Sequence, residues 1–153
     1  MQQRNLAIAR SVASFDLHQV AAPSSEGQRA ARVTLEIMNW TAVAAVLLAL
    51  AVAFGAFGAH GLRGRIDEYS MSVYERAVLY HFLHALGLLI VSQMPRVPAA
   101  VGWLLLAGVV LFSGSLYLLA ITGVRTLGAV TPFGGIAFIA AWVVLAWSAM
   151  KKS

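Results

Sequence analysis

Four long stretches of the sequence carry no charged side chain. They cover residues 38–62, 77–95, 97–124 and 126–150, and each is at least 19 residues long. A helix needs about 20 apolar residues to cross a hydrocarbon layer of about 30 Å, and a helix satisfies its own backbone hydrogen bonds there. The pattern therefore predicts an all-α integral membrane bundle. We expect four transmembrane helices, near 40–60, 77–95, 99–122 and 131–150.

The composition excludes several other classes of protein. Of the 153 residues, 60% are hydrophobic and 11% are charged, whereas a soluble domain is about 45–50% apolar and about 25% charged. The chain has no cysteine, which excludes a disulfide scaffold and a cysteine-based zinc site. The net charge of +5 does not indicate nucleic acid, because the basic residues flank the expected helices or lie in the N-terminal segment.

Residues 1–37 form a polar N-terminal extension, and residues 38–153 form the expected transmembrane domain. The extension lacks the apolar core of a secretory signal. It is either a disordered tail or the product of a mistaken start, with translation beginning at Met38. A mitochondrial-type presequence is a third interpretation, against which the three acidic residues of the segment count.

A short interfacial helix is expected near residues 64–75, between the first two spans. Leu62, Ile66, Tyr69 and Val73 recur at a spacing of three to four residues, which is typical of an amphipathic helix. Its positive and negative side chains balance, so the segment is a poor anchor for anionic lipid.

The basic residues near the helix ends give a preferred orientation. Four spans put both termini on the same side of the membrane. That side carries five basic residues near the helix ends, and the other side carries four. This favours cytoplasmic termini. A chain that began at Met38 would show three against four and favour the opposite orientation.

Uncharged polar side chains gather toward one end of the expected bundle. The first and third helices end where the second and fourth begin, so these groups share one membrane face. A polar group without a partner costs several kcal/mol in hydrocarbon, and we therefore expect the groups to face one another. The candidate polar cluster consists of His60, His84, Ser113, Ser115, Tyr117 and Thr131. The opposite half is apolar apart from Thr41, Ser92, Gln93 and Ser148.

Small residues predict close helix contacts. In lipid no hydrophobic force drives helices together, and small side chains let the backbones approach and gain van der Waals contact. The glycines expected at helix contacts are Gly55, Gly58, Gly114, Gly134 and Gly135.

The cluster suggests three kinds of chemistry, and none is favoured. Histidines bind metal or haem, but no acidic or cysteine ligand lies inside the membrane beside them. Ser113 or Ser115 with His84 as base would lack the orienting acid of a nucleophilic site. A proton relay lacks an intramembrane carboxylate. We therefore expect the histidines to hydrogen-bond to Ser113, Tyr117 or Thr131 across helices, and we predict no catalytic residue, metal ligand or cofactor.

Four segments occur in an order that is similar to a known family. They read GAFGAHGL at 55–62, YHFLHAL at 80–86, LFSGSLY at 111–117 and TPFGG at 131–135, followed by Trp142. The chain resembles the YgdD/YwdK-like family of small bacterial membrane proteins, also called domain of unknown function 423 and related to eukaryotic transmembrane protein 256. The resemblance covers about residues 38–150 and implies a four-helix protein of the bacterial inner membrane. Relatives resembling this chain can carry glutamine at the position of His81, which counts against His81 as a metal ligand.

These observations predict a small integral membrane protein of unknown molecular function. We expect a non-enzymatic accessory or structural component, whose partners are the lipid bilayer and either a second copy or another membrane protein. One alternative is a transporter or channel that uses the candidate polar cluster. Another is a haem- or metal-binding redox component.

Overall fold

The regular elements are all helical in the part of the chain that the structure describes. The structure, a computed structural model, describes residues 25–151, with side chains from residue 40 onward. No strand occurs in this range. The elements are α2 (Ser25–Phe57), η2 (Gly58–Leu62), α3 (Glu68–Gln93), α4 (Ala99–Gly108), η3 (Val109–Ser113), α5 (Gly114–Thr122), η4 (Arg125–Ala129) and α6 (Thr131–Met150). The segments η2 and η3 are π-helical, and η4 is a 3₁₀ helix.

The chain divides into two units, residues 1–35 and residues 36–153. All contacts given below lie within the second unit. The predicted extension at 1–37 lies largely outside the described residues, since the description begins at Ser25 and side chains are described only from Trp40. Whether the extension is a tail or a mistaken start stays a prediction.

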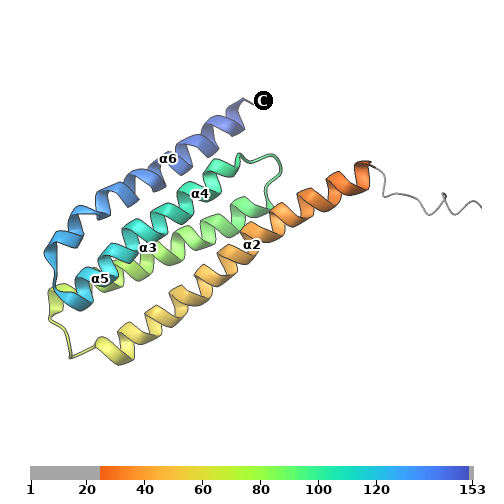
Figure 1. Cartoon of the computed structure of the whole chain (residues 1–153). Coiled ribbons are helices and arrows are strands. Elements are labelled where there is room, and N and C mark those ends of the chain that lie inside the picture. Colours follow the sequence, from red (N-terminus) through yellow and green to blue (C-terminus); the bar gives the residue numbers. More distant parts are fainter. Residues whose placement is uncertain (1–24, 152–153) are drawn as a thin grey trace, which may run out of the picture. The chain divides into compact units, whose positions relative to one another are not determined.

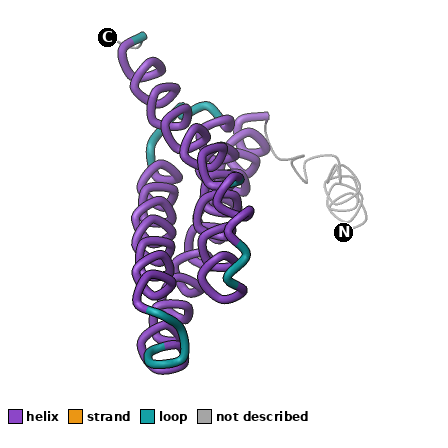
Figure 2. Tube along the Cα trace, turned by 90° about the vertical axis from the view of Figure 1, so that its left-hand side faces the viewer, coloured by secondary structure: helices purple, strands orange, loops and turns teal. Residues whose placement is uncertain are grey.

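The second unit consists of helical rods that run in alternating directions (Figure 1). The inner rods are α3 and the continuous helix formed by α4, η3 and α5, which pack against each other. The outer rod α6 packs on α4 and η3, and Figure 2 shows the rods from a second side. Over an 18-residue stretch within Ala99–Thr122 half of the residues are buried, against 17% over such a stretch within Trp40–Leu62 and 17% within Arg125–Met150. The outer rods therefore expose most of their apolar surface.

Three described segments are long and apolar enough to cross a membrane. They are Trp40–Leu62, Ala99–Thr122 and Arg125–Met150. Helix α3 has 26 residues, a sufficient length. It is not among the three, because its polar side chains lower its mean hydropathy. The predicted helix at 131–150 matches α6 in both bounds, and the predicted helix at 99–122 contains the π-helical segment η3.

The expectation of a separate interfacial helix near 64–75 was wrong. The chain turns at Gly64, whose φ of 78° suits glycine, and α3 then runs unbroken from Glu68 to Gln93. Asp67 caps the start of α3: its carboxylate accepts hydrogen bonds from the Ser70 main-chain N–H at 3.0 Å and the Ser70 hydroxyl at 2.7 Å. The amphipathic segment thus forms the first turns of the helix that was expected at 77–95.

Two apolar clusters hold the second unit together. The larger draws buried residues from all four rods, among them Ala44, Leu88, Leu105 and Phe138. The smaller lies where α3 begins and α5 ends, and it is formed by Leu62, Val73, Tyr74, Leu119 and Ala120. The smaller cluster lies beside the residues of the candidate polar cluster, and it positions the aromatic side chains described next.

Candidate functional site

The structure separates the candidate polar cluster into distinct groups. Tyr117 pairs with His81, Ser115 pairs with Thr131, and His84 stacks on aromatic rings. His60 is exposed, and Ser113 is buried. The six predicted residues therefore do not converge on one point.

Tyr117 and His81 form a part-buried polar contact between two helices. The Tyr117 hydroxyl lies 3.3 Å from Nδ1 of His81, a side chain that is only 3% exposed. The Tyr117 ring also packs at 4.9 Å from Phe54 and 5.0 Å from Tyr74. Tyr74 in turn donates its hydroxyl hydrogen to the main-chain carbonyl of Phe54 at 2.8 Å. These contacts link α2, α3 and α5.

His81 was not among the six residues of the candidate polar cluster, although the histidines as a group were expected to hydrogen-bond across helices. It lies three residues before His84, on a neighbouring face of the helix. The observed contact is of the kind expected for the cluster, a histidine hydrogen-bonded to Tyr117 across helices. Nε2 of His81 has no hydrogen-bond partner among the described residues.

Ser115 and Thr131 join α5 to the first turn of α6. Their hydroxyl oxygens are 2.9 Å apart, and the Ser115 hydroxyl also lies 3.0 Å from the Phe112 main-chain carbonyl. Pro132 follows Thr131 in the first turn of α6, where the missing N–H of proline leaves no helical bond unmade. The hydroxyl pair therefore fixes the place where the last helix starts.

His84 is held by its own helix and by an aromatic stack. Its Nδ1–H donates to the main-chain carbonyl of Tyr80 at 2.8 Å. The imidazole lies nearly parallel to the Phe138 ring, with centroids 3.4 Å apart, and its centroid is 5.9 Å from that of Tyr80. His84 thus packs α3 against α6 rather than reaching the other polar side chains of the cluster.

His60 and Ser113 form no side-chain hydrogen bond with another described residue. The side chain of His60 is exposed on the π-helical segment η2. The Ser113 side chain is fully buried, and its hydroxyl oxygen has no hydrogen-bond partner among the described residues. Neither residue therefore contributes a polar contact between helices.

The five glycines expected at helix contacts differ in how closely a neighbour approaches. A Cβ at Gly134 would overlap the backbone of Phe112, and one at Gly58 would lie 2.6 Å from the Tyr74 ring. A Cβ at Gly55 would be 3.4 Å from Val78, and one at Gly135 would be 3.8 Å from the Phe112 ring. Gly114, by contrast, is not at a close contact, because a Cβ there would meet nothing within 4 Å.

Both π-helical segments overlap sequence segments that carry the family resemblance. The segment η2 covers five of the eight residues at 55–62, and η3 ends at Ser113 within 111–117. Short π-bulges inside α-helices occur frequently at functional sites. Sequence reasoning could not find them, because one extra residue per turn leaves no mark in an all-apolar stretch.

A second polar group at the opposite end of the rods was also not anticipated. The hydroxyl oxygens of Thr41 and Ser92 are 3.0 Å apart, and the Gln93 amide donates to each of them at 2.9 Å. These residues had been noted only as exceptions in an apolar half. They tie α2 to the end of α3, so the bundle has polar contacts between helices at both ends.

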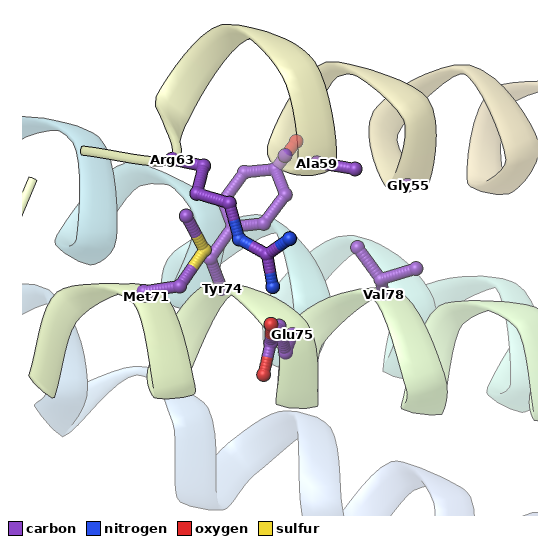
Figure 3. Close-up of a pocket in the computed structure, with 8 residues that line it drawn as sticks. Gly55, Ala59, Arg63, Met71, Tyr74, Glu75 and Val78 are labelled. Atoms are coloured by element: carbon purple, nitrogen blue, oxygen red, sulfur yellow. The ribbon is translucent and has the colours of Figure 1, made fainter. Parts of the chain in front are cut away.

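A small open pocket lies between α2 and α3 near their connecting turn (Figure 3). Its volume is about 180 Å³. We call it the α2–α3 pocket; its lining residues are Gly55, Gly58, Ala59, Arg63, Met71, Tyr74, Glu75 and Val78. Of the residues expected to carry function, it includes only two of the packing glycines.

The described residues provide few side chains that could bind a metal ion together. The described residues contain no group of three or more His, Cys, Asp or Glu side chains that could hold one. The hydrogen bonds of Ser115, His81 and His84 in the described structure involve no carboxylate. The chemistry visible at this end of the bundle is hydrogen bonding and aromatic packing between helices.

Comparison with known proteins identifies similar membrane proteins. The profile of a family described as "Protein of unknown function (DUF423)" matches residues 54–135. The UPF0382 membrane protein YwdK of Bacillus subtilis is 47% identical over 108 residues, which cover 67% of this chain and 88% of that protein. A UPF0382 membrane protein of Staphylococcus haemolyticus is 50% identical over 106 residues, which cover 67% and 87% respectively. No solved structure matches.

Proposed function

Because this chain belongs to the DUF423 family, whose relatives are named as bacterial membrane proteins, we propose that it is a non-enzymatic structural component of the bacterial inner membrane. In this proposal four helices cross the bilayer, and the polar side chains between them hold the helices in register. The cluster is then a set of contacts between helices and binds no solute.

One observation carries the proposal: the polar side chains at this end that form hydrogen bonds do so in separate pairs, with each other or with the backbone. Tyr117 bonds to His81, Ser115 to Thr131, and His84 to the Tyr80 carbonyl. A transport site would need these groups to converge on a shared space. The α2–α3 pocket is lined by other residues, apart from the packing glycines. Hydrogen bonds between paired polar side chains commonly stabilise contacts between membrane helices.

The proposal of four spans depends on α3. Two of the polar side chains that lower its hydropathy lie on its inner face: His81 and Ser92 are 3% and 7% exposed, and each makes a hydrogen bond. Arg76 and Gln93, at the two ends of the uncharged stretch, are exposed. The outward residues of α3 include Leu79, Phe82, Leu83 and Ile90, which are exposed and apolar. A helix with its polar groups satisfied inside a bundle can cross lipid although its average composition is less apolar.

Neither alternative function gains a supporting observation. The α2–α3 pocket is not lined by residues of the candidate polar cluster, and the described residues include no group of three or more His, Cys, Asp or Glu side chains that could hold a metal ion. Association with a second copy or another membrane protein stays a prediction, as does the placement of both termini in the cytoplasm.

A flux measurement tests the structural role against transport. Purified protein is reconstituted in vesicles, and the leak of protons, K⁺ and Na⁺ is followed with and without a potential. We expect no flux above that of empty vesicles, and no change with Tyr117→Phe, which removes only the hydroxyl. A protein-dependent flux that Tyr117→Phe abolishes would establish transport through the cluster instead.

The second arm of the test is stability. His84→Ala removes the stack on Phe138, and we expect it to lower the free energy of unfolding by about 1–3 kcal/mol in detergent. The matched control is Arg125→Ala, a change at an exposed residue of η4, which should leave stability within about 0.5 kcal/mol. Equal thermal stability of the two variants would contradict the structural role.

A further inference from the structure

The α2–α3 pocket lies at the depth where the apolar part of the bundle ends. The membrane-spanning segment Trp40–Leu62 stops at Leu62, and Arg63, the next residue, lines the pocket. On the other side, Glu75 and Val78 belong to the part of α3 where charged residues give way to an uncharged stretch. With the bundle in a bilayer, the pocket opens at the level of the lipid head groups. The inference rests on this membrane placement and not on the role of the polar cluster.

Two opposite charges face the pocket from different elements. Figure 3 shows the Arg63 guanidinium above the pocket, pointing toward the Glu75 carboxylate on α3. Both side chains are exposed, and no ion pair joins them in the described structure. A guanidinium is suited to bidentate contact with phosphate, and a carboxylate accepts hydrogen bonds from an ammonium group. Together they can bind a ligand that carries both charges.

The turn between the two elements sets the distance across the pocket. Arg63 follows η2 directly, and Gly64 reverses the chain in the left-handed region. The Arg65 main-chain N–H donates to the Leu62 carbonyl at 2.8 Å, and the Asp67 cap fixes the start of α3. The turn that joins Arg63 to α3, the helix that carries Glu75, is therefore short and hydrogen-bonded.

The walls of the pocket are apolar and its size is small. Gly55, Gly58 and Ala59 line the pocket on the α2 side, while Met71 and Val78 line it from α3. Sites for drug-sized ligands are about 300–1,000 Å³. A volume of about 180 Å³ therefore fits a polar head group with the first carbons of a chain, rather than a whole larger ligand.

We propose that the α2–α3 pocket binds the head group of a zwitterionic phospholipid with a primary ammonium, a phosphoethanolamine group. The phosphate lies against Arg63, and the ammonium lies against Glu75. The acyl chains continue along the small-residue face of α2. Phosphatidylcholine lacks the N–H donors that Glu75 requires, and phosphatidylglycerol lacks the cation.

The experiment measures lipid binding to the purified, delipidated full-length protein. Phosphatidylethanolamine, phosphatidylcholine and phosphatidylglycerol with the same acyl chains are titrated separately, and binding is read from the shift in melting temperature and by native mass spectrometry. We expect phosphatidylethanolamine to bind about tenfold more tightly than either other lipid, since one charge-assisted contact is worth about this factor. Equal binding of the three lipids would overturn the proposal.

Substitutions at Arg63 and Glu75 test the role of each charge in lipid binding. Arg63→Gln should weaken all three phospholipids by about tenfold, while Glu75→Gln should weaken phosphatidylethanolamine alone and remove its advantage. Ala59→Leu should block the pocket without changing a charge. The control is Arg65→Gln, an exposed basic residue of the same turn that does not line the pocket. A loss of binding in Arg65→Gln equal to that in Arg63→Gln would show a general charge effect and refute the site.

Free phosphoethanolamine distinguishes a lipid from a soluble ligand. The lipid should bind more tightly than the free head group, because its chains add apolar contact with α2. Equal affinity of the free compound would exclude a lipid as the occupant. These outcomes are independent of the flux assay, so failure of the lipid site leaves the proposed structural role of the cluster untouched, and the reverse also holds.

Discussion

Gly134 shows how closely single residues control the packing of this bundle. It brings the first turn of α6 onto the π-helical segment η3, where an added Cβ would lie 2.7 Å from the Phe112 Cα. Backbone atoms cannot yield as a flexible side chain can. Gly114 lies on the neighbouring helix and meets nothing within 4 Å. The two residues look alike in sequence, and only their surroundings in three dimensions distinguish them.

Alanine substitution at the two glycines should therefore give opposite results. Gly134→Ala should lower the free energy of unfolding by about 1–3 kcal/mol, the usual cost of overpacking. Gly114→Ala should leave it unchanged or raise it by up to about 1 kcal/mol, because alanine favours a helix. Both can be measured by thermal unfolding in detergent. Destabilisation of the two variants by the same amount would show that the Gly134 contact is not as close as described.

At this scale the sequence predicted the residue types of the site better than their partners. Small residues and buried hydroxyls were expected between helices, and Gly134, Ser115 and Thr131 lie there. The pairing of Tyr117 with His81 rather than with His84 depends on the rotation of α3 about its axis. Residues three positions apart on a helix lie on adjacent faces, so the sequence alone does not decide which of the two histidines turns inward.

The element that the sequence described least well is α3. A change from charged to uncharged residues near Arg76 suggested two separate helices. Such a change does not interrupt the backbone hydrogen bonds of a helix. No proline or glycine occurs between Glu68 and Leu86, and the apolar residues keep one helical phase through this range. The true boundary lies at Asp67, whose side chain caps the helix. For α6, by contrast, the predicted start at Thr131 was correct. Pro132 lies in the first turn, where a missing N–H breaks no helical hydrogen bond, whereas the Thr131 hydroxyl pairs with Ser115 and does not cap the helix.

The cap of α3 makes a prediction about pH. Hydrogen bonds from the Ser70 hydroxyl and main-chain N–H lower the pKa of Asp67 below its ordinary value of 3.8. A carboxyl group with a lowered folded pKa stabilises the protein above its unfolded pKa, and this stabilisation is lost as the pH falls through the folded value. Unfolding should therefore become easier as the pH falls below 3.8.

Asp67→Asn separates the charge from the cap. Asparagine still accepts a hydrogen bond at a helix start but does not titrate, so this variant should lose the part of the acid sensitivity that comes from Asp67. Asp67→Ala should lower stability at neutral pH as well. Melting curves in detergent from about pH 6 to about pH 3 measure both effects. Identical pH profiles for the natural chain and Asp67→Asn would contradict the role of the cap.

On the scale of the whole molecule, the pattern of buried surface distinguishes inner from outer helices. In the rod formed by α4, η3 and α5 half of the residues of an 18-residue stretch are buried, against 17% of such a stretch in each of the outer spans, Trp40–Leu62 and Arg125–Met150. The exposed side chains of α6 include Phe133, Ile136, Ile139 and Val143. Near its end, Lys151 lies over the ring of Trp147, 5.1 Å from its centroid, a pairing suited to a membrane surface.

Four spans make a definite prediction about the two ends of α3. The chain has no cysteine, so single cysteines can be introduced without background. Arg65→Cys and Arg125→Cys should react with an impermeant thiol reagent from one side of the membrane, and Met94→Cys and Lys151→Cys from the other. Cytoplasmic termini would place the second pair inside the cell. Labelling of residues 65 and 94 from the same side would show that α3 does not cross.

The inward polar face of α3 also affects how the protein is made. The chain emerges from the ribosome with α3 before α5, and the hydroxyl that meets His81 belongs to Tyr117, 36 residues further on. Until that residue has been synthesised, α3 presents an unsatisfied imidazole to any lipid around it, at a cost of several kcal/mol. Stable insertion of α3 is therefore expected to wait for α5, so that the two inner helices enter the bilayer as a pair.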